Sequence, residues 1–147
     1  MLELAEDEQQ AFIEHIKQKV LSGKVPAEGQ PVLTMLIGAP GSGKSYLAHK
    51  IKNSAYCSPD DIVAEYIKAM DIDPRSDFFD KDIEKFTARV YDEVVQAIID
   101  GGYNFTCDSS KTISGKEVID YMTRRGYKAD IKVILADEYQ VALNAVE

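Results

Sequence analysis

Residues 38–45 read Gly38-Ala39-Pro40-Gly41-Ser42-Gly43-Lys44-Ser45, which is the G-x-x-x-x-G-K-S pattern of a phosphate-binding loop. An apolar run at 32–37 leads into this loop as a buried strand would, and a helix is expected at 46–53. In that setting the backbone N–H groups of the loop point at one anion, and its glycines let the backbone approach the anion closely. The stretch predicts that the chain binds a nucleoside triphosphate. The alternative, a glycine turn that ends by chance in Lys-Ser, is disfavoured by the strand before it and the helix after it.

The residues of the loop have separate expected roles. Lys44 brings a positive charge to the β- and γ-phosphates and is expected to take part in catalysis. The Ser45 hydroxyl is expected to bind Mg²⁺. The nucleotide is expected to contact every residue of the loop and the tyrosine that follows it, namely Gly38, Ala39, Pro40, Gly41, Ser42, Gly43, Lys44, Ser45 and Tyr46.

Length and charge point to one domain that acts on a small molecule. The chain has 147 residues, about the size of a single domain, and a net charge of -8. Proteins that grip a nucleic-acid backbone usually present positive surface, so a nucleic-acid partner is disfavoured, although a local basic groove stays open. No apolar run reaches the ~20 residues of a membrane span, and the acidic N-terminus is unlike a signal peptide. The cysteines, Cys57 and Cys107, are expected to be reduced core residues, which favours a cytoplasmic location.

Helical and strand-like segments alternate along the chain. The expected helices are 7–22, 46–53, one that starts at the N-cap Ser58, 80–100, one from a capping box at Ser114 to Gly126, and one from 138. The expected strands are 32–37, 55–57, 103–107 and 131–136, and loops are expected at 24–31 and 71–77. Strands that alternate with helices form a mostly parallel sheet covered on both faces, with right-handed crossovers. We therefore expect an α/β fold in which residues 1–30 form an N-terminal helix and linker, and 31–147 form the phosphate-binding domain.

Two acidic residues follow the second expected strand. Ligands in such folds sit at the carboxyl ends of the strands, so Asp60 is placed to face an acceptor hydroxyl. A carboxylate there orients the hydroxyl and accepts its proton during phosphoryl transfer. The alternative is that Asp60 and Asp61 only stabilise the start of a helix, which is worth about 0.3–1 kcal/mol each. One acid suffices for that purpose, so Asp60 is expected to be catalytic, and Asp61 is expected either at the substrate or as the capping partner.

A second polar cluster, Asp108-Ser109-Ser110, ends the third expected strand. Asp108 is expected to hold Mg²⁺ through water or to bind a substrate hydroxyl, and the alternative is an ordinary strand-end turn. Ser110 and Lys111 are expected at the substrate as well. A solvated surface lysine is an equally good interpretation of Lys111.

Together these residues resemble the zeta-toxin group of P-loop kinases, with polynucleotide kinases as wider relatives. Besides the loop and the pair Asp60-Asp61, the resemblance depends on three short phrases: Gln30-Pro31, Gly101-Gly102-Tyr103-Asn104-Phe105 before Asp108, and Arg125-Gly126-Tyr127. It implies a three-layer P-loop NTPase/kinase fold. It also implies that the catalytic aspartate of the family falls on Asp60 and its substrate-binding acid on Asp108.

The resemblance further implies the reaction and the partners. Zeta toxins move the γ-phosphate of ATP or GTP to a sugar hydroxyl of a nucleotide sugar, with Mg²⁺. An antitoxin-like protein is an expected partner of the N-terminal helix, unless that helix packs on its own domain. The sequence departs from the family pattern at Val63 and Thr112, where basic residues are expected. The sequence also ends at Glu147, before the arginine-bearing lid of the family. We therefore expect a C-terminally short fold, which is a truncated fragment, a chain whose lid comes from a partner, or a naturally short and weakened member.

Two other functions stay open. The first is a catalytically weak nucleotide-binding module or regulator, because an arginine clamp contributes about 10³–10⁵ to the rate. The second is a 5′-hydroxyl polynucleotide kinase, which the acidic net charge disfavours.

Overall fold

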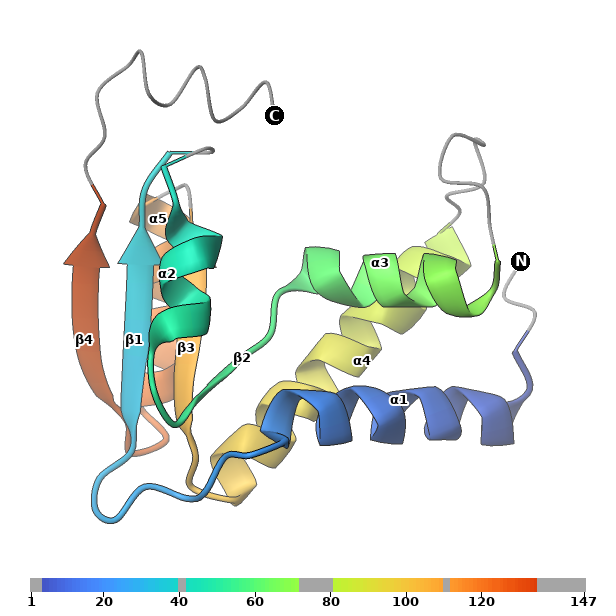
Figure 1. The fold of residues 1–147 in the computed structure, drawn as a ribbon, viewed down its shortest axis with the longest axis horizontal. Coiled ribbons are helices and arrows are strands. Elements are labelled where there is room, and N and C mark those ends of the chain that lie inside the picture. Colours follow the sequence, from blue (N-terminus) through green and yellow to red (C-terminus); the bar gives the residue numbers. More distant parts are fainter. Residues whose placement is uncertain (1–3, 40–41, 72–80, 110–111, 135–147) are drawn as a thin grey trace. The chain divides into compact units, whose positions relative to one another are not determined.

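The structure is a computed structural model that describes residues 4–39, 42–71, 81–109 and 112–134, without the side chains of residues 45, 109 and 112–114. The chain divides into two compact units (Figure 1). Unit 1 comprises Met1–Ser22 and Cys57–Ala97, and unit 2 comprises Gly23–Tyr56 and Ile98–Glu147. The predicted boundary between residues 30 and 31 stays a prediction. The predicted helix from 138, and the predicted loop at 71–77 except Asp71, lie outside the described residues.

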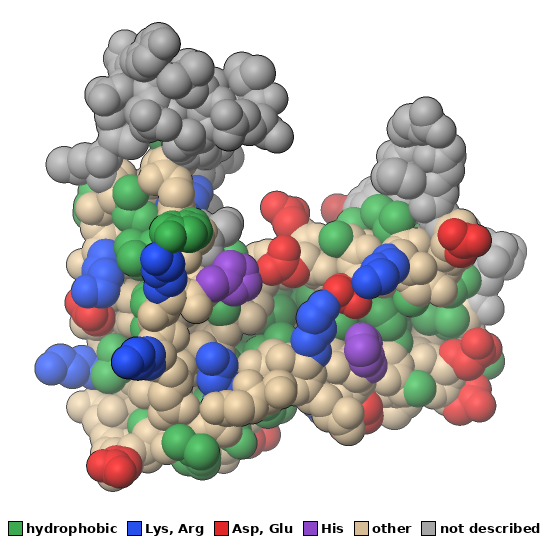
Figure 2. All heavy atoms as spheres, viewed as in Figure 1, with side chains coloured by type: hydrophobic (Ala, Val, Ile, Leu, Met, Phe, Trp, Pro, Cys, Tyr) green, Lys and Arg blue, Asp and Glu red, His purple; other side chains and the backbone are tan. Residues whose placement is uncertain are grey.

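Charge is divided unevenly between the two units. The described part of unit 1 has twice as many acidic as basic residues, whereas that of unit 2 has more basic than acidic residues. The sequence contains no Asp or Glu from residue 29 to residue 59, a span that includes the phosphate-binding loop. Figure 2 shows basic side chains gathered over unit 2 and acidic ones over unit 1. The net charge of the whole chain therefore says little about the surface around the loop.

Unit 2 is built on a parallel four-stranded sheet. Its strands are β1 (Val32–Ile37), β2 (Ser54–Tyr56), β3 (Asn104–Ser109) and β4 (Lys128–Val133), in the order β2-β3-β1-β4. Its helices are α2 (Lys44–Lys50) and α5 (Thr112–Thr123). The central strands β1 and β3 form the core of unit 2. Their side chains Leu33, Met35 and Phe105 are fully buried there.

The connections between these strands decide which helix covers which face. The path from β1 to β2 and the path from β3 to β4 run in opposite directions across the sheet. Right-handed crossovers therefore place α2 and α5 on opposite faces, and Figure 1 shows α2 in front of the sheet and α5 behind it. The predicted α/β architecture with a parallel sheet is confirmed. Ligands in such folds bind where the connections diverge, which here is the carboxyl end of β1 and β3.

Several element boundaries differ from those predicted. β4 begins three residues before the predicted 131–136, because pairing with β1 from Val32↔Lys128 to Ile37↔Val133 sets its register. α5 begins at Thr112, so the predicted capping box at Ser114 is wrong as a helix start. α2 begins at Lys44 rather than at residue 46, directly after Gly43. α2, α5 and β4 each end three residues before the predicted residues 53, 126 and 136. The remaining boundaries differ by one or two residues, which is the usual scatter at element ends.

The amino ends of the strands in unit 2 are tied together by polar side chains. The Gln30 side chain donates to the Gly126 carbonyl oxygen at 3.1 Å. Asn104 Oδ1 accepts a hydrogen bond of 2.8 Å from the backbone N–H of Val32. The Tyr127 hydroxyl donates to the Tyr103 carbonyl oxygen. Each of the three short sequence phrases that carry the family resemblance contributes a residue to this network. These phrases therefore stabilise the amino end of the sheet, opposite the loop.

Tyr127→Phe is expected to lower the free energy of unfolding by about 1–2 kcal/mol, because it leaves the Tyr103 carbonyl oxygen without its donor. Burial raises the pKa of Tyr127 to about 12. A folded-state pKa above the unfolded value of about 10 means that the phenol contributes stability below pH 10, and that this contribution is lost as the pH rises to 12. Urea titrations at pH 7 and at pH 11 measure both effects. A variant as stable as the wild type at pH 7 would contradict the assignment.

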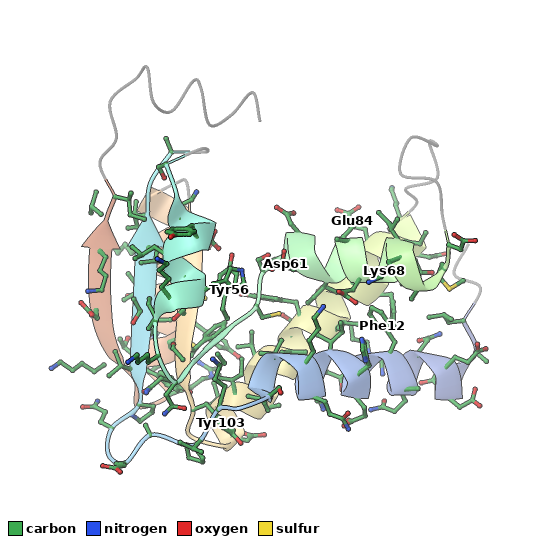
Figure 3. The ribbon with its side chains drawn as sticks, viewed as in Figure 1. Phe12, Tyr56, Asp61, Lys68, Glu84 and Tyr103 are labelled. Carbon is green, nitrogen blue, oxygen red and sulfur yellow. The ribbon has the colours of Figure 1, made fainter. Side chains whose placement is uncertain are left out.

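Unit 1 is a three-helix cluster of α1 (Glu6–Leu21), α3 (Pro59–Ala69) and α4 (Lys81–Asp100), whose last turn belongs to unit 2. Its centre is a trio of aromatic rings from the three helices, Phe12, Tyr66 and Phe86, with ring centroids 5.8–5.9 Å apart. Figure 3 labels Phe12 on α1. Glu65 on α3 forms an ion pair with Lys19 on α1, and this pairing lowers the pKa of the Glu65 carboxyl. The N-terminal helix thus packs on α3 and α4. This agrees with the expectation that it packs on its own chain.

The helices of unit 1 bury apolar side chains that recur at helical spacing. On α4 the buried side chains are Ile83, Phe86, Val90, Val94 and Ile98. On α1, Phe12 and Ile16 are buried together with Ile13, whereas Val20 is only half-buried. None of the described helices is long and apolar enough to cross a membrane.

Candidate functional site

The described part of the phosphate-binding loop is folded back on itself between β1 and α2. The Ser42 backbone N–H donates to the Ala39 carbonyl oxygen at 3.1 Å, which closes a turn. Gly43 has a φ of 96°, a left-handed conformation that suits glycine, and its carbonyl oxygen accepts the first helical hydrogen bond, from Leu47. Pro40 and Gly41 lie outside the described residues. The described residues on the two sides of this gap, Ala39 and Ser42, are therefore within hydrogen-bonding distance of each other.

Gly38 is the most crowded glycine of the loop among the described residues. A Cβ atom there would lie 2.7 Å from Ser42 Oγ, 3.2 Å from the Ile134 carbonyl oxygen and 3.3 Å from Ile134 Cβ. The Ile134 backbone is fixed by a hydrogen bond of 2.7 Å from its N–H to the Ile37 carbonyl oxygen. A side chain at position 38 therefore has to displace Ser42 or distort the end of β1.

Gly38→Ala is expected to lower the free energy of unfolding by about 1–3 kcal/mol through overpacking, and to weaken ATP binding because the loop shifts. Chemical denaturation and calorimetric titration with ATP measure the two effects. Gly29→Ala is the matched control, because a Cβ at Gly29 meets no atom within 4 Å. Equal stability and affinity in the two variants would contradict the crowding argument.

Asp108 lies next to the loop because β1 and β3 are paired in parallel. Leu36 is in register with Asp108, and Ile37 with Ser109, directly before the loop starts. A Cβ at Gly115 on α5 would lie 3.7 Å from Ile37 Cδ1, so Ile37 faces α5. Side chains alternate along a strand, so Leu36 and Asp108 project to the other face, which α2 covers. The half-buried Asp108 carboxylate thus lies on the side of the sheet where α2 and Lys44 begin.

The other residues predicted at the nucleotide are described in part. Lys44 is half-buried and is the first residue of α2. Tyr46 is 68% exposed, and Lys50 Nζ lies 4.3 Å from the centroid of its ring. The Ser45 side chain, Ser110 and Lys111 lie outside the described residues.

Asp60 and Asp61 belong to unit 1, where they occupy the first turn of α3 (Figure 3 labels Asp61). The predicted helix start is confirmed, because Ser58 Oγ accepts a hydrogen bond of 3.2 Å from the Asp61 N–H and Pro59 is the first helical residue. The side-chain cap therefore comes from Ser58 and from neither carboxylate. Both aspartates are exposed to solvent.

The cysteines are structural, as predicted. Cys57 and Cys107 are buried, and neither forms a disulfide. Burial, and secondarily the nearby Asp61 carboxylate, raise the pKa of the Cys57 thiol to about 12. A raised pKa and burial are typical of a structural cysteine rather than a reactive one.

Sequence comparison decides the family. The chain matches the zeta toxin family over residues 17–146, a span that contains the loop, Asp60, Asp61 and Asp108. The chain belongs to the zeta toxin family. Among curated proteins none matches its sequence.

Solved structures agree with the fold of this zeta toxin family member. A chain from the PezAT chromosomal toxin-antitoxin system of Streptococcus pneumoniae superposes with a TM-score of 0.75 at 17% identity. The match covers 98% of the present chain and 63% of the other, so this chain spans less than two thirds of that neighbour's length. Two structures of the Pnkp1/Rnl/Hen1 complex, one described as an RNA repair complex, give TM-scores of 0.54 and 0.57 at 21% and 23% identity. These matches cover 82% and 79% of this chain, and 40% and 37% of the others.

Of the two predicted Mg²⁺ ligands in this zeta toxin family member, only the Asp108 side chain is described. Among the described residues no group of three His, Cys, Asp or Glu side chains is close enough to hold a metal ion. Mg²⁺ usually takes one or two carboxylates and completes its shell with water and substrate phosphates. Asp108 beside the loop provides such a carboxylate.

Sequence reasoning did not find one feature of the loop. The Ser42 Oγ atom is buried, and it has no hydrogen-bond partner among the described residues. No local pattern marks such an atom, because burial depends on the surrounding fold.

Proposed function

We propose that this chain is a phosphotransferase that moves the γ-phosphate of ATP or GTP to a hydroxyl group of a small molecule, with a nucleotide sugar as the acceptor class. The observation that carries the proposal is the folded loop between β1 and α2 with Asp108 in register beside it. The zeta toxin family and the kinase-like neighbours support a kinase-like function.

The loop and Lys44 are the proposed phosphate-binding elements. The loop N–H groups hold the phosphate oxygens, and the Lys44 ammonium stabilises the negative charge that develops on the transferred group. Asp108, with Ser45, would hold Mg²⁺. When bound, that ion neutralises charge on the β- and γ-phosphates.

Asp60 is the proposed general base. Its carboxylate orients the acceptor hydroxyl and takes up its proton as the oxygen attacks the γ-phosphorus. The proposal is supported by the Ser58 cap, because helix stabilisation then does not require the Asp60 carboxylate. Asp61, Ser110 and Lys111 are the proposed contacts to the acceptor, and the nucleotide is proposed to contact residues 38–46.

Transfer of label from γ-labelled ATP to a panel of nucleotide sugars tests this function. We expect label in a nucleotide sugar when Mg²⁺ is present and none after chelation. GTP in place of ATP establishes which donor is preferred. Binding of ATP without transfer to any acceptor would contradict the enzyme and favour a regulatory nucleotide-binding module.

A protein partner of antitoxin type is also proposed. The support is that one structural neighbour comes from a toxin-antitoxin system. Because the apolar stripe of α1 is buried in unit 1, a partner that binds α1 would meet its exposed acidic residues, which are Glu6, Asp7, Glu8 and Glu14. We therefore expect a basic partner surface.

The cytoplasmic location stays a prediction.

A second candidate function, phosphorylation of 5′-hydroxyl nucleic-acid ends, is favoured by the charge distribution. The loop lies in the basic unit, in a span without carboxylates, and α2 exposes Tyr46 together with His49 and Lys50. Basic groups beside exposed aromatic rings suit single-stranded nucleic acid. Single-stranded oligonucleotides with a 5′-hydroxyl, tested in the same labelling assay, distinguish this function from transfer to a nucleotide sugar.

A further inference from the structure

The edge strand β4 exposes a row of charged side chains on the face of the sheet that carries α2. Ile37 faces α5, so its neighbour Leu36 projects to the other face, on the side of α2. Residues that pair in register project to the same face, so β4 presents Lys128, Asp130 and Lys132 on that side as well. All three are exposed. Among the described elements, α2 packs mainly on β3 and β1 and leaves this row of side chains uncovered.

The outer side of α2 adds an aromatic ring and further basic groups to the same face. Tyr46 and Lys50 are each two residues from the buried Ala48, which places them on the opposite side of the helix. Tyr46 is 68% exposed, and Lys50 Nζ lies 4.3 Å from the centroid of its ring. His49 is exposed too, and its ring contacts that of Tyr56 on β2 at a centroid distance of 5.0 Å. The sequence of α2 contains no acidic residue.

These exposed side chains form a basic surface, the α2–β4 face, which comprises Tyr46, His49, Lys50, Lys128, Asp130 and Lys132. Its acidic member, Asp130, lies 3.6 Å from Lys132, and both side chains are about half exposed. Such an exposed ion pair is weak in water, so Lys132 can exchange its partner for another anion. Figure 2 views unit 2 from the side of α2 and shows more basic than acidic side chains there. The opposite face is different, because α5 mixes exposed acidic and basic residues.

The α2–β4 face leads to the phosphate-binding loop. β4 runs parallel to β1, and Lys132 is in register with the residue two positions before Gly38. The Ile134 backbone N–H donates to the Ile37 carbonyl oxygen at 2.7 Å, so β4 stays beside β1 up to the start of the loop. Lys128 lies four residues earlier, which is about 13 Å back along a strand. A chain of phosphate groups that lies along β4 therefore has one end near the loop.

We propose that the α2–β4 face binds single-stranded nucleic acid, with its lysines on the phosphates and the Tyr46 ring stacked on a base. Basic surfaces with exposed aromatic rings bind single strands in this way, largely without sequence preference. An acidic protein would meet the same lysines, but the ring beside them favours a ligand with flat bases. This surface lies outside the loop, so binding of a strand does not depend on transfer of phosphate to a nucleotide sugar. It provides a binding surface for the second candidate function.

Fluorescence anisotropy with a single-stranded oligothymidylate of about 12 nucleotides tests the proposal, because sites of this kind cover about 4–16 nucleotides. The strand carries a 5′-hydroxyl and a dye at its 3′ end. Lys128→Gln and Lys132→Gln should each weaken binding about fivefold at about 0.1 M salt, because each removes one phosphate contact. Each should also lower the slope of log K against log salt by about 0.7. Lys116→Gln is the matched control, because it removes the same charge from an exposed position on α5, and it should bind like the wild type.

Tyr46→Leu separates stacking from charge. It should weaken binding of the strand about 5- to 150-fold, the usual effect of losing one stacked base, and leave the salt slope unchanged. Equal effects of Lys116→Gln and the two β4 variants, or no binding of the strand by the wild type at about 50 mM salt, would overturn the inference. Competition by polyglutamate as strong as that by unlabelled strand would also overturn it, because it would indicate a surface for acidic proteins. ATP titrations of the β4 variants should give wild-type affinity, so the proposed function is tested separately.

Discussion

Asp60→Asn is expected to reduce phosphate transfer by about 10²- to 10⁴-fold, the usual contribution of a positioned general base. The amide has nearly the size of the carboxylate but cannot accept the proton of the acceptor hydroxyl. ATP affinity should stay close to that of the wild type, because the phosphates are assigned to the loop in unit 2 and Asp60 belongs to α3 in unit 1. The loss of one acid from the first turn of α3 should cost only about 0.3–1 kcal/mol of stability.

Steady-state transfer assays and ATP titrations on the same preparations check this result. Asp71→Asn is the control for the change in net charge, because Asp71 is an exposed residue that follows the other end of α3. Its φ of 53° lies in the left-handed region, which asparagine tolerates well. Full turnover in Asp60→Asn would remove Asp60 from the mechanism. An equal loss in both variants would show that charge alone matters.

Lys44→Met is expected to weaken ATP binding and to lower phosphate transfer by about 10²- to 10³-fold, the usual effect of removing one group that stabilises transition-state charge. Methionine keeps an unbranched apolar chain and loses the ammonium group. Lys44 is half-buried at the start of α2, directly after Gly43. A methionine there should fold normally and leave the loop without its positive charge.

Lys50→Met separates this local role from a general effect of charge. Lys50 lies on the same short helix, but it is exposed and stacks over the Tyr46 ring at 4.3 Å. We expect its loss to leave transfer to a nucleotide sugar nearly intact and to reduce transfer to 5′-hydroxyl oligonucleotides, if those are accepted. Equal losses in both lysine variants would contradict the assignment of Lys44 to the phosphates.

Elements marked by local chemistry were predictable from the sequence. The start of α3 follows from Ser58 and Pro59, because a cap and a fixed φ act within one helical turn. The apolar stripe of α4 follows from the helical period, since residues such as Val90 and Val94 recur on one face. The turn after β1 follows from its glycines, of which Gly43 needs a left-handed backbone.

Elements that depend on distant partners were less predictable. β4 alternates charged with apolar residues at Lys128, Asp130 and Lys132, and its true start is fixed only by pairing with β1. The family phrases were recognised as patterns, but their role appeared only in three dimensions. Gln30, Asn104 and Tyr127 tie the amino ends of the strands together instead of touching the loop.

The sequence by itself determined the loop, the alternation of strands and helices, and the family, because each depends on short-range spacing of residue types. The tertiary structure decided which side chains lie close together in space. The parallel register set Asp108 beside Leu36 on the face covered by α2, and the end of β4 brought Ile134 close to Gly38. It also separated an acidic unit from a basic one within a chain of net charge -8. These features arise from contacts between residues far apart in the chain, and no local pattern encodes them.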